Sequence, residues 1–351
     1  MRIALIAPPF ISVPPQRYGG TELFVAQLAT GLKDLGHEPI VYTNGESTIA
    51  VECRWIYPHC EWPIDGEIHA HLKDINHTSW AIADARRDCD LIHLNNAPGL
   101  AHSRTVDLPM VYTIHHPVEP MLSEYYGWYP DVYYVTISDF QLRKEKLPRM
   151  RRIHHGLNFE QYRLGTRRDE EEYVAFIGRI APMKAPHLAI QAAKRAGVKL
   201  KMAGEVQPVY QDYFDREIKP HIDGSNIEYI GEADLEAKNE LLGNAIAMLF
   251  PIQWDEPFGL VTIEAMACGT PVLAFAGGSV SEIVEDGVSG WICSSVEDMA
   301  DRIRTAAEFD PADVRAYAER NFSLGRMVRE YAKLYEEILA ERSTRPSLAV
   351  A

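Results

Sequence analysis

Short apolar segments alternate with helical patterns along most of this chain, and that alternation limits the folds that it can adopt. In the first half, apolar segments of strand length lie at residues 2–7, 38–43, 91–94, 110–114 and 132–137. In the second half, they lie at residues 173–178, 199–203, 227–230, 245–250, 272–275 and 290–293. Strands that are separated by helices are joined by crossovers, which place helices on both faces of a parallel sheet. The sequence therefore predicts an α/β protein with doubly wound parallel sheets.

The length of the chain indicates two domains. A chain of 351 residues is long enough for two hydrophobic cores of ordinary size. The charged segment 167–172 has no apolar period and is the predicted linker. We therefore expect one Rossmann-like domain over residues 1–160 and a second over residues 170–323. A long amphipathic helix is expected at residues 324–339.

Some helix ends are also marked in the sequence. The amphipathic pattern of residues 21–35 ends at Gly36, which is a common residue after a helix. Ser279 and Glu282 have the spacing of a capping box, so we expect a helix to begin there. The pair Asp286-Gly287 predicts the turn that follows that helix.

Composition excludes several classes of protein. The net charge of −15 argues against a general nucleic-acid binder, because phosphate contact requires a basic face. The 5 cysteines are odd in number and contain no Cys-x-x-Cys pair, which favours a reducing, cytoplasmic compartment. The N-terminal apolar run is stopped by Pro8, and no segment approaches the ~18 apolar residues of a membrane span. The basic run Arg143–Arg152 is either an exposed interdomain strand or a peripheral contact with anionic lipid. The oligomeric state is left open.

Two carboxylates stand 8 residues apart around a predicted buried helix. Gly259 is expected to open that helix and Gly269 to close it, so that Glu256 lies in the preceding loop and Glu264 lies about one and a half turns inside. A charge in such an apolar run is costly, and the N–H groups at a helix start favour an anion. Both carboxylates can then face one ligand with hydroxyls at two points and phosphate between them, such as a nucleotide sugar. The alternative is a structural helix in which Glu264 pairs with a buried cation.

The segment 256–272 resembles the E-x7-E signature of retaining glycosyltransferases in the large family 4 group, also described as glycosyl transferases group 1. Members have the GT-B fold, in which two doubly wound Rossmann-like domains face each other across a cleft. The resemblance implies that residues 170–323 bind the nucleotide-sugar donor and that residues 1–160 form the acceptor side. It also implies that the C-terminal helix, about residues 324–351, packs back on the N-terminal domain.

The resemblance further assigns roles within this segment. Glu256 is expected to contact the donor sugar, and Glu264 is expected to hold the ribose hydroxyls. Backbone N–H groups of Phe258, Gly259 and Leu260 would complete the donor pocket.

Two cations follow the first strand of the second half, in the segment Gly178-Arg179-Ile180-Ala181-Pro182-Met183-Lys184. A guanidinium fork and an ammonium point charge together suit a diphosphate. The resemblance assigns Gly178, Arg179 and Lys184 to the donor diphosphate, where the cations would stabilise the charge that the leaving nucleotide gains. A surface ion pair is the alternative. Many relatives have Gly where this chain has Ala185.

A glycine pair follows the first strand and opens the first helix. Gly19 and Gly20 allow the backbone to approach a phosphate or a sugar closely, although the pattern is not G-x-G-x-x-G. The resemblance matches both to the family's glycine loop, which faces the donor diphosphate and the acceptor. Arg17 in the same loop is expected to reach an acceptor.

A histidine pair ends another predicted strand. The resemblance places His115 near the C6 side of the donor sugar. Relatives usually have Asp at the next position, whereas this chain has His116. A histidine that is hydrogen-bonded within the core is the alternative.

Further candidates at strand ends share small or polar side chains. In the first half and just before the linker they are Asn95, Asn96, Ser138, Gly156 and Asn158. The second set falls where relatives contact the base: Val206, Gln207, Gly231 and Glu232.

No metal site is expected. The segment Asp88-Cys89-Asp90 has the D-x-D form of metal-dependent glycosyltransferases of another fold, but it lies between a helix and a strand and is interpreted as a solvated helix end. His69, His71, His77 and His93 match no usual zinc spacing.

Together these patterns predict a retaining, metal-independent glycosyltransferase. It would move a hexose from a nucleoside-diphosphate sugar, taken as a UDP-sugar, to a hydroxyl of a saccharide, natural-product or lipid acceptor. Glu256, His115, Arg179 and Lys184 are the predicted catalytic residues, and no cofactor besides the donor substrate is expected. Two alternatives stay open: a non-catalytic nucleotide-sugar-binding protein and a nicotinamide-dependent oxidoreductase. The missing G-x-G-x-x-G after the first strand counts against the second.

Overall fold

The computed structural model describes residues 1–16, 19–62, 64, 66–165 and 172–344. The chain divides into two compact units: unit 1 comprises Met1–His155 and Leu324–Ala351, and unit 2 comprises Gly156–Ser323. Residues 167–171 of the predicted linker lie outside the described residues. Among the helices of the described part, none combines the length and apolar character that crossing a membrane requires.

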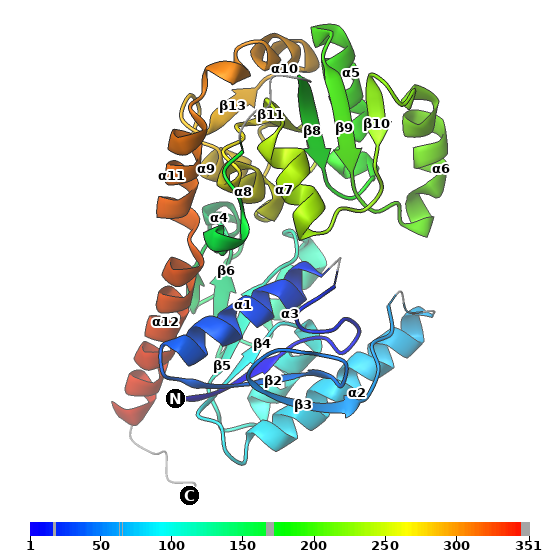
Figure 1. The fold of residues 1–351 in the computed structure, drawn as a ribbon. Helices are drawn as coiled ribbons and strands as arrows, with labels where there is room; N and C mark the ends of the chain where they lie inside the picture. The colour runs from blue at the N-terminus through cyan, green and yellow to red at the C-terminus, as the bar shows by residue number, and fades with distance from the viewer. Residues whose placement is uncertain (17–18, 63, 65, 166–171, 345–351) are drawn as a thin grey trace, which may run out of the picture. The chain divides into compact units, whose positions relative to one another are not determined.

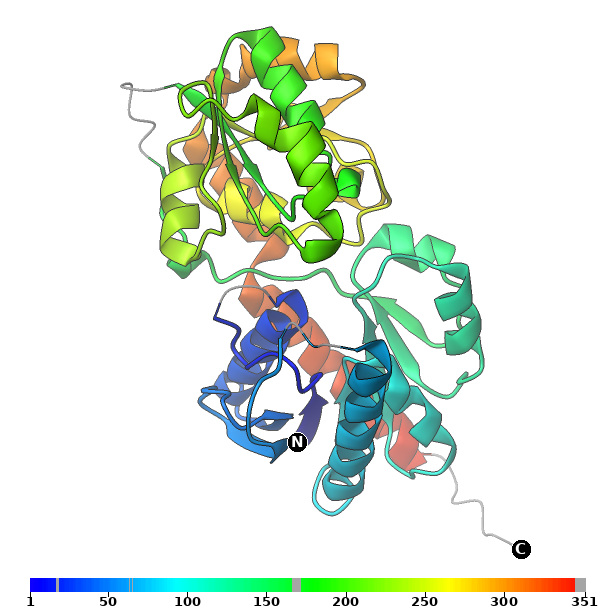
Figure 2. The same cartoon turned by 90° about the vertical axis from the view of Figure 1, so that its right-hand side faces the viewer.

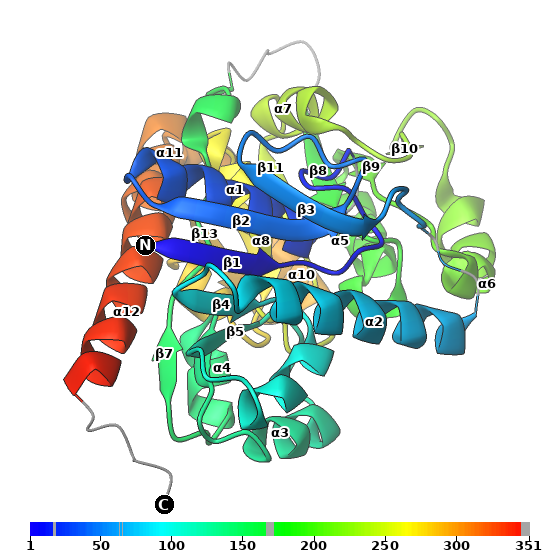
Figure 3. The same ribbon diagram turned by 90° about the horizontal axis from the view of Figure 1, so that it is seen from below.

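Unit 1 is built, within its described residues, on a seven-stranded parallel sheet with the order β3-β2-β1-β4-β5-β6-β7 (Figure 3). The order reverses between β1 and β4, so the carboxyl ends of these two strands flank a switch point, where ligands of doubly wound sheets bind. The strands are β1 (Arg2–Ile6), β2 (Glu38–Asn44), β3 (Glu52–Tyr57), β4 (Leu91–Leu94), β5 (Met110–Ile114), β6 (Tyr133–Thr136) and β7 (Met150–Arg152).

Helices cover both faces of this sheet because successive strand residues point to opposite sides. Ile3 and Leu5 of β1 face a core formed with α1 (Gly20–Asp34) and α12 (Leu324–Thr344). Ala4 and Ile6 face the opposite core, which is formed with α2 (Glu67–Ala85), the 3-10 helix η1 (Ala97–Arg104) and α3 (Pro120–Gly127). The short helix α4 (Asp139–Lys144) precedes β7.

Unit 2 is built, in the part of the chain that is described, on a six-stranded parallel sheet with the order β10-β9-β8-β11-β12-β13 (Figure 1). The order reverses between β8 and β11, which places a second switch point at the carboxyl ends of those strands. The strands are β8 (Tyr173–Ile177), β9 (Lys199–Ala203), β10 (Ile227–Tyr229), β11 (Ala247–Phe250), β12 (Val272–Phe275) and β13 (Gly290–Cys293).

The helices of unit 2 complete its core. Apolar residues of α5 (Pro186–Ala196) and α10 (Val296–Ile303) pack with strand residues in one core cluster. The helix α8 (Leu260–Ala267) packs against β11 and β12, and it also contacts α7 (Leu235–Gly243) and α11 (Pro311–Phe322). Shorter helices include η2 (Phe159–Gln161), η3 (Pro182–Lys184), η4 (Pro208–Tyr210), α6 (Gln211–Tyr213), η5 (Phe214–Ile218), η6 (Lys219–His221), α9 (Val280–Ile283) and η7 (Ala306–Glu308).

Every strand that the sequence predicts is present, and β4, β5, β9, β12 and β13 have the predicted bounds. The strand β3 was not predicted. It lies at the edge of the sheet, none of its residues is fully buried, and it therefore lacks the continuous apolar run that marks a central strand. The strand β7, at the other edge, falls inside the basic run Arg143–Arg152.

The predicted capping box is wrong, although a helix does begin at Val280. Ser279 itself has helical backbone angles and makes no side-chain capping bond. Its buried hydroxyl donates instead to the carbonyl of Phe258 at 3.0 Å. The need to satisfy a buried carbonyl thus takes the hydroxyl away from the helix start.

The C-terminal helix α12 packs closely against α1 in unit 1 (Figure 2). Tyr335 of α12 is hydrogen-bonded through its hydroxyl to His93 Nδ1 at 2.7 Å, and the Tyr331 hydroxyl lies 2.9 Å from Thr113 Oγ1. Gly31 of α1 makes the close approach possible, because a Cβ at this position would lie 2.4 Å from Cγ2 of Val328.

Replacement of Gly31 by leucine is expected to destabilise unit 1. The added side chain meets a stiff β-branched neighbour, and overpacking of this kind costs about 1–3 kcal/mol of unfolding free energy. Urea unfolding followed by intrinsic fluorescence measures the loss. The control is Gly127→Leu in α3, where an added Cβ meets nothing within 4 Å. Equal stability of the two variants would show that α1 and α12 do not require this glycine.

Candidate functional site

The loop between β11 and α8 ends in a left-handed glycine. Gly259 has φ +85° and is the N-cap of α8, a backbone conformation that residues with a Cβ rarely adopt. Thr262 adds a hydroxyl bond to the carbonyl of Gly259 at 2.7 Å, which fixes the first turn of the helix. The predicted helix start, the predicted helix end and the positions of the two carboxylates are confirmed.

Glu264 lies in the interior of α8 and is only 3 % exposed. Lys238 Nζ, on α7, donates to both carboxylate oxygens at 2.9 and 3.0 Å. The Tyr162 hydroxyl, which follows η2, donates to Oε1 at 2.9 Å. A carboxylate inside a helix that is buried from Thr262 to Ala267 needs such partners. Glu264 thus has a cationic partner, as the structural alternative expected, but the side chain of that lysine is 27 % exposed rather than buried.

Glu256 is 6 % exposed and lies in the loop that follows β11. Its Oε2 accepts from Lys184 Nζ at 2.5 Å and from Trp254 Nε1 at 2.8 Å. The Lys184 ammonium also lies over the ring of Trp254, 4.7 Å from its centroid, and over that of Phe250 at 5.7 Å. The structure therefore brings two of the predicted catalytic residues, Glu256 and Lys184, into direct contact.

Arg179 follows β8, the strand beside β11. Its Nη1 lies 3.5 Å from Gln207 Oε1, and its buried Nε has no partner among the described residues. A guanidinium has five N–H donors, so Arg179 retains bonding capacity for an anion. Gly204, which directly follows β9, allows its backbone to pack closely against that of Gly178, because a Cβ there would lie 1.8 Å from the carbonyl oxygen of Gly178.

The residue at which many relatives have Gly has a left-handed backbone conformation in this chain. Ala185 has φ +52° and ψ +48°, and it is the one non-glycine residue with positive φ in the described part of the chain. An alanine in this region is strained by about 1–2 kcal/mol. It closes η3, which carries Lys184, and caps the start of α5.

The loop of Glu256 packs on the glycines that follow β12. The Ser279 N–H donates to the Glu256 carbonyl at 2.9 Å. A Cβ on Gly278 would lie 2.3 Å from that same carbonyl oxygen. A cavity of about 650 Å³ opens beside this loop and is lined by residues that include Trp254, Asp255 and Phe275.

The residues that the sequence predicts to contact the nucleotide base lie near Arg179. Gly204 N–H donates to the carbonyl of Gly231 at 2.8 Å, and Ile180 N–H donates to that of Glu205 at 2.9 Å. Gln207 bridges Arg179 and Glu205 through its side-chain amide. Phe258 is buried in the core.

In unit 1, the predicted glycine loop opens α1. Gly19 has φ +144°, and a Cβ there would meet Pro15 Cβ at 2.8 Å and a Glu22 carboxylate oxygen at 2.9 Å. Gly20 has open space at the same position, with nothing within 4 Å. The predicted acceptor contact Arg17 lies outside the described residues.

His115 lies at the end of β5 and is held by aromatic neighbours. Its ring stacks on that of His155 with centroids 5.6 Å apart and meets Phe24 edge-on at 4.9 Å. Its Nε2 lies 3.0 Å from Asn95 Oδ1. Burial lowers the pKa of His115 well below its ordinary value, and the neighbouring histidines lower it further. Burial also lowers the pKa of His116. His115 is therefore a neutral imidazole that both donates and accepts hydrogen bonds.

The remaining strand-end candidates of unit 1 form hydrogen bonds to other residues of the same unit. Asn96 donates to Asp74 Oδ1 at 2.7 Å and also to Thr78. Ser138 caps α4 by accepting from the Gln141 N–H at 3.2 Å. In unit 2, Asn158 similarly caps η2.

The segment Asp88-Cys89-Asp90 is part of a surface ion-pair network. Asp88 pairs with Arg2 at 3.0 Å and with Arg54 at 2.8 Å, and Asp90 accepts from the Arg2 backbone N–H at 2.7 Å. The carboxylates thus face cationic arginines. His77 and His93, two of the discounted histidines, are buried and hydrogen-bonded.

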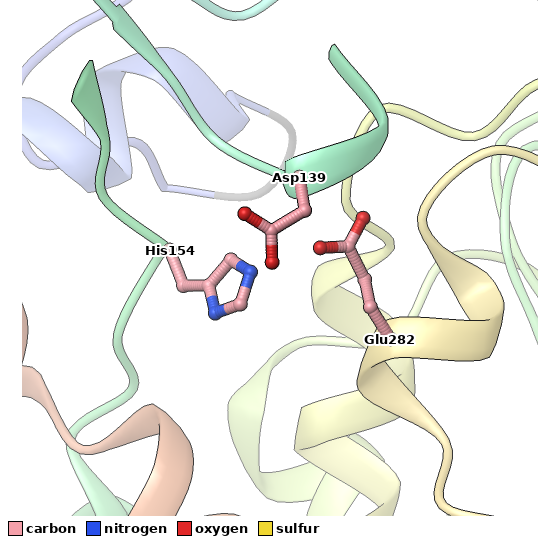
Figure 4. A group of neighbouring side chains, drawn as sticks. All are labelled: Asp139, His154 and Glu282. Carbon is pink, nitrogen blue, oxygen red and sulfur yellow. The ribbon is translucent and has the colours of Figure 1, made fainter. Parts of the chain in front are cut away.

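The basic run is partly neutralised within unit 1. Arg149 pairs with Asp131 at 3.6 Å, and Arg151 pairs with Glu337 at 2.7 Å. Arg152 Nε donates to Asp139 Oδ1 at 3.2 Å. Figure 4 shows Asp139 at the start of α4 and His154 just after β7, both in unit 1, with Glu282 on α9 of unit 2.

Three residues of the site were not predicted from the sequence. Lys238 lies on α7, and Tyr162 and Trp254 lie in loops. Lys238 and Tyr162 have no spacing that links them to the carboxylates, since α7, α8 and the Tyr162 segment meet only through tertiary packing. Trp254, two residues before Glu256, was the nearest available signal.

Acidification is expected to destabilise unit 1 through His93. Burial lowers its pKa from 6.5 to about 3, so the unfolded chain binds a proton more readily than the folded one. The stability contributed by neutral His93 is complete above pH 6.5 and is lost as the pH falls towards 3, with about 2 kcal/mol lost by pH 5.

Urea unfolding of wild type and His93→Gln at pH 7.5 and 5 tests this. The variant should lose less stability between the two pH values, whereas the control His59→Gln, at an exposed site, should behave as wild type. An identical pH dependence for His93→Gln and wild type contradicts the assignment.

Gly278→Ala is expected to disturb the Glu256 loop. Gly278 and Gly197 both have positive φ, +58° and +71°, so alanine strains the backbone at either position. Only at Gly278 does the new Cβ also meet the Glu256 backbone. Gly197→Ala should therefore cost about 1 kcal/mol, and Gly278→Ala about 1–3 kcal/mol more. Thermal unfolding of both variants measures the difference, and equal melting temperatures would rule out the close contact.

Comparisons with known proteins agree with this geometry. The family profile described as "Glycosyl transferases group 1" matches residues 159–321, and that described as "Glycosyltransferase Family 4" matches residues 18–157. The D-inositol 3-phosphate glycosyltransferase of Mycolicibacterium smegmatis is 29% identical over 210 residues, which are 55% of this chain and 48% of that protein. The chain spans half or less of the length of the first curated relatives that it matches.

Solved structures match almost the whole chain. AviGT4, a glycosyltransferase involved in avilamycin A biosynthesis, is 26% identical with a TM-score of 0.70, covering 97% of this chain and 98% of that one. Anabaena HepE, solved in complex with UDP and glucose, is 19% identical with a TM-score of 0.75, covering 96% of this chain and 100% of that one. The predicted family and fold are confirmed. The chain has the GT-B fold and belongs to the group 1 glycosyltransferases of family 4.

Proposed function

We propose that this glycosyltransferase is a retaining enzyme that moves a hexose from a UDP-sugar to a hydroxyl of a saccharide, natural-product or lipid acceptor. The observation that carries the proposal is the pair Glu256 and Glu264, both buried beside the switch point of unit 2 and each bonded to a lysine. Two such carboxylates suit a donor with hydroxyls at both ends. The binding of UDP and glucose by Anabaena HepE, which shares the fold, supports the choice of donor.

We assign the sugar to Glu256 and the ribose to Glu264. Glu256 accepts a hydrogen bond from Trp254, which lines a cavity together with Phe275, and aromatic faces next to carboxylates are suited to sugar rings. Glu264 is the fifth residue of α8. The free N–H groups of the first turn, at Leu260 and its neighbours, attract a phosphate. In this assignment, the diphosphate of the donor lies between the hexose at Glu256 and the ribose at Glu264.

The cations suit that diphosphate. Arg179 has an unpaired Nε and a long contact to Gln207, so its donors are available. Lys184 is the second cation, and in the free protein its ammonium is held by Glu256. Since the leaving nucleotide gains negative charge in the transition state, these groups would stabilise the transition state more than the bound donor, and we propose that they do so without a metal ion.

In the proposed reaction, the acceptor oxygen forms a bond to the anomeric carbon as the bond from that carbon to the phosphate oxygen breaks. Attack occurs on the face from which the nucleotide leaves, so the anomeric configuration is retained. The departing phosphate oxygen takes the acceptor proton. Orientation and exclusion of water would supply most of the remaining rate.

Unit 1 is proposed to bind the acceptor. Gly20, with open space above it, permits close approach of a sugar or phosphate. His115, kept neutral by burial, is proposed to bond a hydroxyl of the donor sugar as a donor or an acceptor. A cytoplasmic location is also proposed, in keeping with the free state of the 5 cysteines.

Nucleotide binding is the first step of the test. Thermal shift is measured with UDP, GDP, ADP, TDP and NAD, since a ligand at 100 times its dissociation constant adds about 2.7 kcal/mol to the folded state. A shift with UDP alone among the diphosphates supports the proposed donor. A shift with NAD and with no diphosphate would favour an oxidoreductase and contradict the proposal.

The two carboxylates are then separated by substitution. Glu256→Gln is expected to abolish transfer while changing UDP affinity less than threefold, because it contacts only the sugar. Glu264→Gln should weaken UDP binding by about 10–100-fold, since bonds to charged groups contribute about 1.5–3 kcal/mol. Calorimetry and a UDP-release assay measure the two effects. Equal losses of affinity in both variants would contradict the division of roles, and binding without turnover in wild type would favour a non-catalytic protein.

A further inference from the structure

The carboxylate of Glu264 is held from two directions by residues of other segments. Lys238, on α7, bonds both oxygens, and Tyr162 bonds Oε1. These contacts form inside unit 2, and neither Lys238 nor Tyr162 belongs to a motif that the sequence singles out.

Tyr162 is the fixed partner. It is 5 % exposed, and its backbone carbonyl accepts from Arg315 Nη1 at 2.8 Å. Arg315 also bonds the carbonyls of Phe159 and Ala267, which ties the segment of Tyr162 to the end of α8. The adjacent residue Arg163 donates its backbone N–H to Asn239 on α7 at 2.7 Å. The hydroxyl of Tyr162 is thus anchored relative to both helices.

Lys238 is the partner that compensates the charge. Its ammonium sits 2.9 and 3.0 Å from the two oxygens and so bridges the carboxylate symmetrically. With Glu264 only 3 % exposed, removal of this cation leaves a buried carboxylate with one neutral donor. Such a group gains by turning towards another donor, and that change alters what it offers to a ligand.

The bonds already made limit what Glu264 can accept. A carboxylate has about four lone-pair positions, and Lys238 and Tyr162 fill three of them. The direction of the remaining one is therefore set by these two residues. A ligand hydroxyl must meet the carboxylate from that direction.

We propose that Lys238 and Tyr162 are positioning residues that set the recognition of the nucleotide ribose through Glu264. The proposal rests on the proposed function, in which Glu264 contacts the ribose hydroxyls. Lys238 compensates the charge of the carboxylate and orients it, and Tyr162 fixes its rotation. Selectivity for a ribose over a sugar that lacks the 2′ and 3′ hydroxyls then depends on Lys238, although Lys238 itself does not touch the ribose.

The test is the ratio of dissociation constants for 2′,3′-dideoxy-UDP and UDP, measured by calorimetry on the full chain. Wild type should prefer UDP by about 10–100-fold. Lys238→Met should reduce that preference to threefold or less by weakening UDP binding and leaving the dideoxynucleotide unchanged. Lys238→Arg should keep most of the preference, because a guanidinium can bond both oxygens. Tyr162→Phe should give an intermediate ratio.

The matched control is Lys199→Met. Lys199 begins β9 and pairs with Glu228 of β10 at 2.5 Å, so the substitution removes a half-buried lysine–glutamate pair at the amino end of the strands. Its ratio should equal that of wild type. Circular dichroism confirms folding of each variant, and Tyr162→Phe, which removes one hydroxyl, remains informative if Lys238→Met unfolds.

The outcomes separate the inference from the function on which it rests. Equal weakening of UDP and dideoxy-UDP in Lys238→Met would show a merely structural role and overturn the proposal, as would an unchanged or tighter affinity for UDP. Glu264→Gln is measured alongside. If it abolishes the preference and Lys238→Met does not, the inference alone fails. If wild type shows no preference, or no UDP binding, both the ribose role of Glu264 and the inference fail.

Discussion

Burial of charge is the constraint on which the donor side of this protein depends. Unit 2 holds two carboxylates that are nearly excluded from water, and each needs a cation and a second donor to be stable there. Glu256 takes Lys184 and Trp254, and Glu264 takes Lys238 and Tyr162. These contacts place strict demands on β8, β11, α7 and α8, because a shift of any of them leaves a charge without its partner.

The parallel sheet explains why these groups meet. Because β8 and β11 are parallel neighbours, their carboxyl ends lie side by side at one edge of unit 2, at the point where the strand order reverses. Lys184 follows one strand and Glu256 follows the other, so an ion pair forms between residues that are far apart in the sequence. Close backbone approaches at Gly204 and Gly278 then allow the loops at this edge to pack without side chains between them.

Much of this arrangement was predictable from local patterns. The apolar segments located the central strands, and Gly259 with Gly269 marked both ends of α8, because these signals lie within a few residues of the elements that they define. The edge strand β3 was missed because its half-exposed residues lack an apolar run. The capping box at Ser279 was wrong because a tertiary contact with Phe258 competes for the hydroxyl. Lys238 and Tyr162 carry no local signal, since their role comes only from the packing of α7 and the Tyr162 segment around α8.

A crystal structure of the protein with UDP-glucose bound tests the central claim most directly. The account predicts that a ribose hydroxyl lies within hydrogen-bond distance of Glu264, that the hexose contacts Glu256, and that Arg179 contacts the diphosphate. Tyr162 should remain bonded to Glu264 in that complex. A nucleotide bound elsewhere on unit 2, or one that leaves Glu264 in contact with Lys238 and Tyr162 alone, would contradict the account.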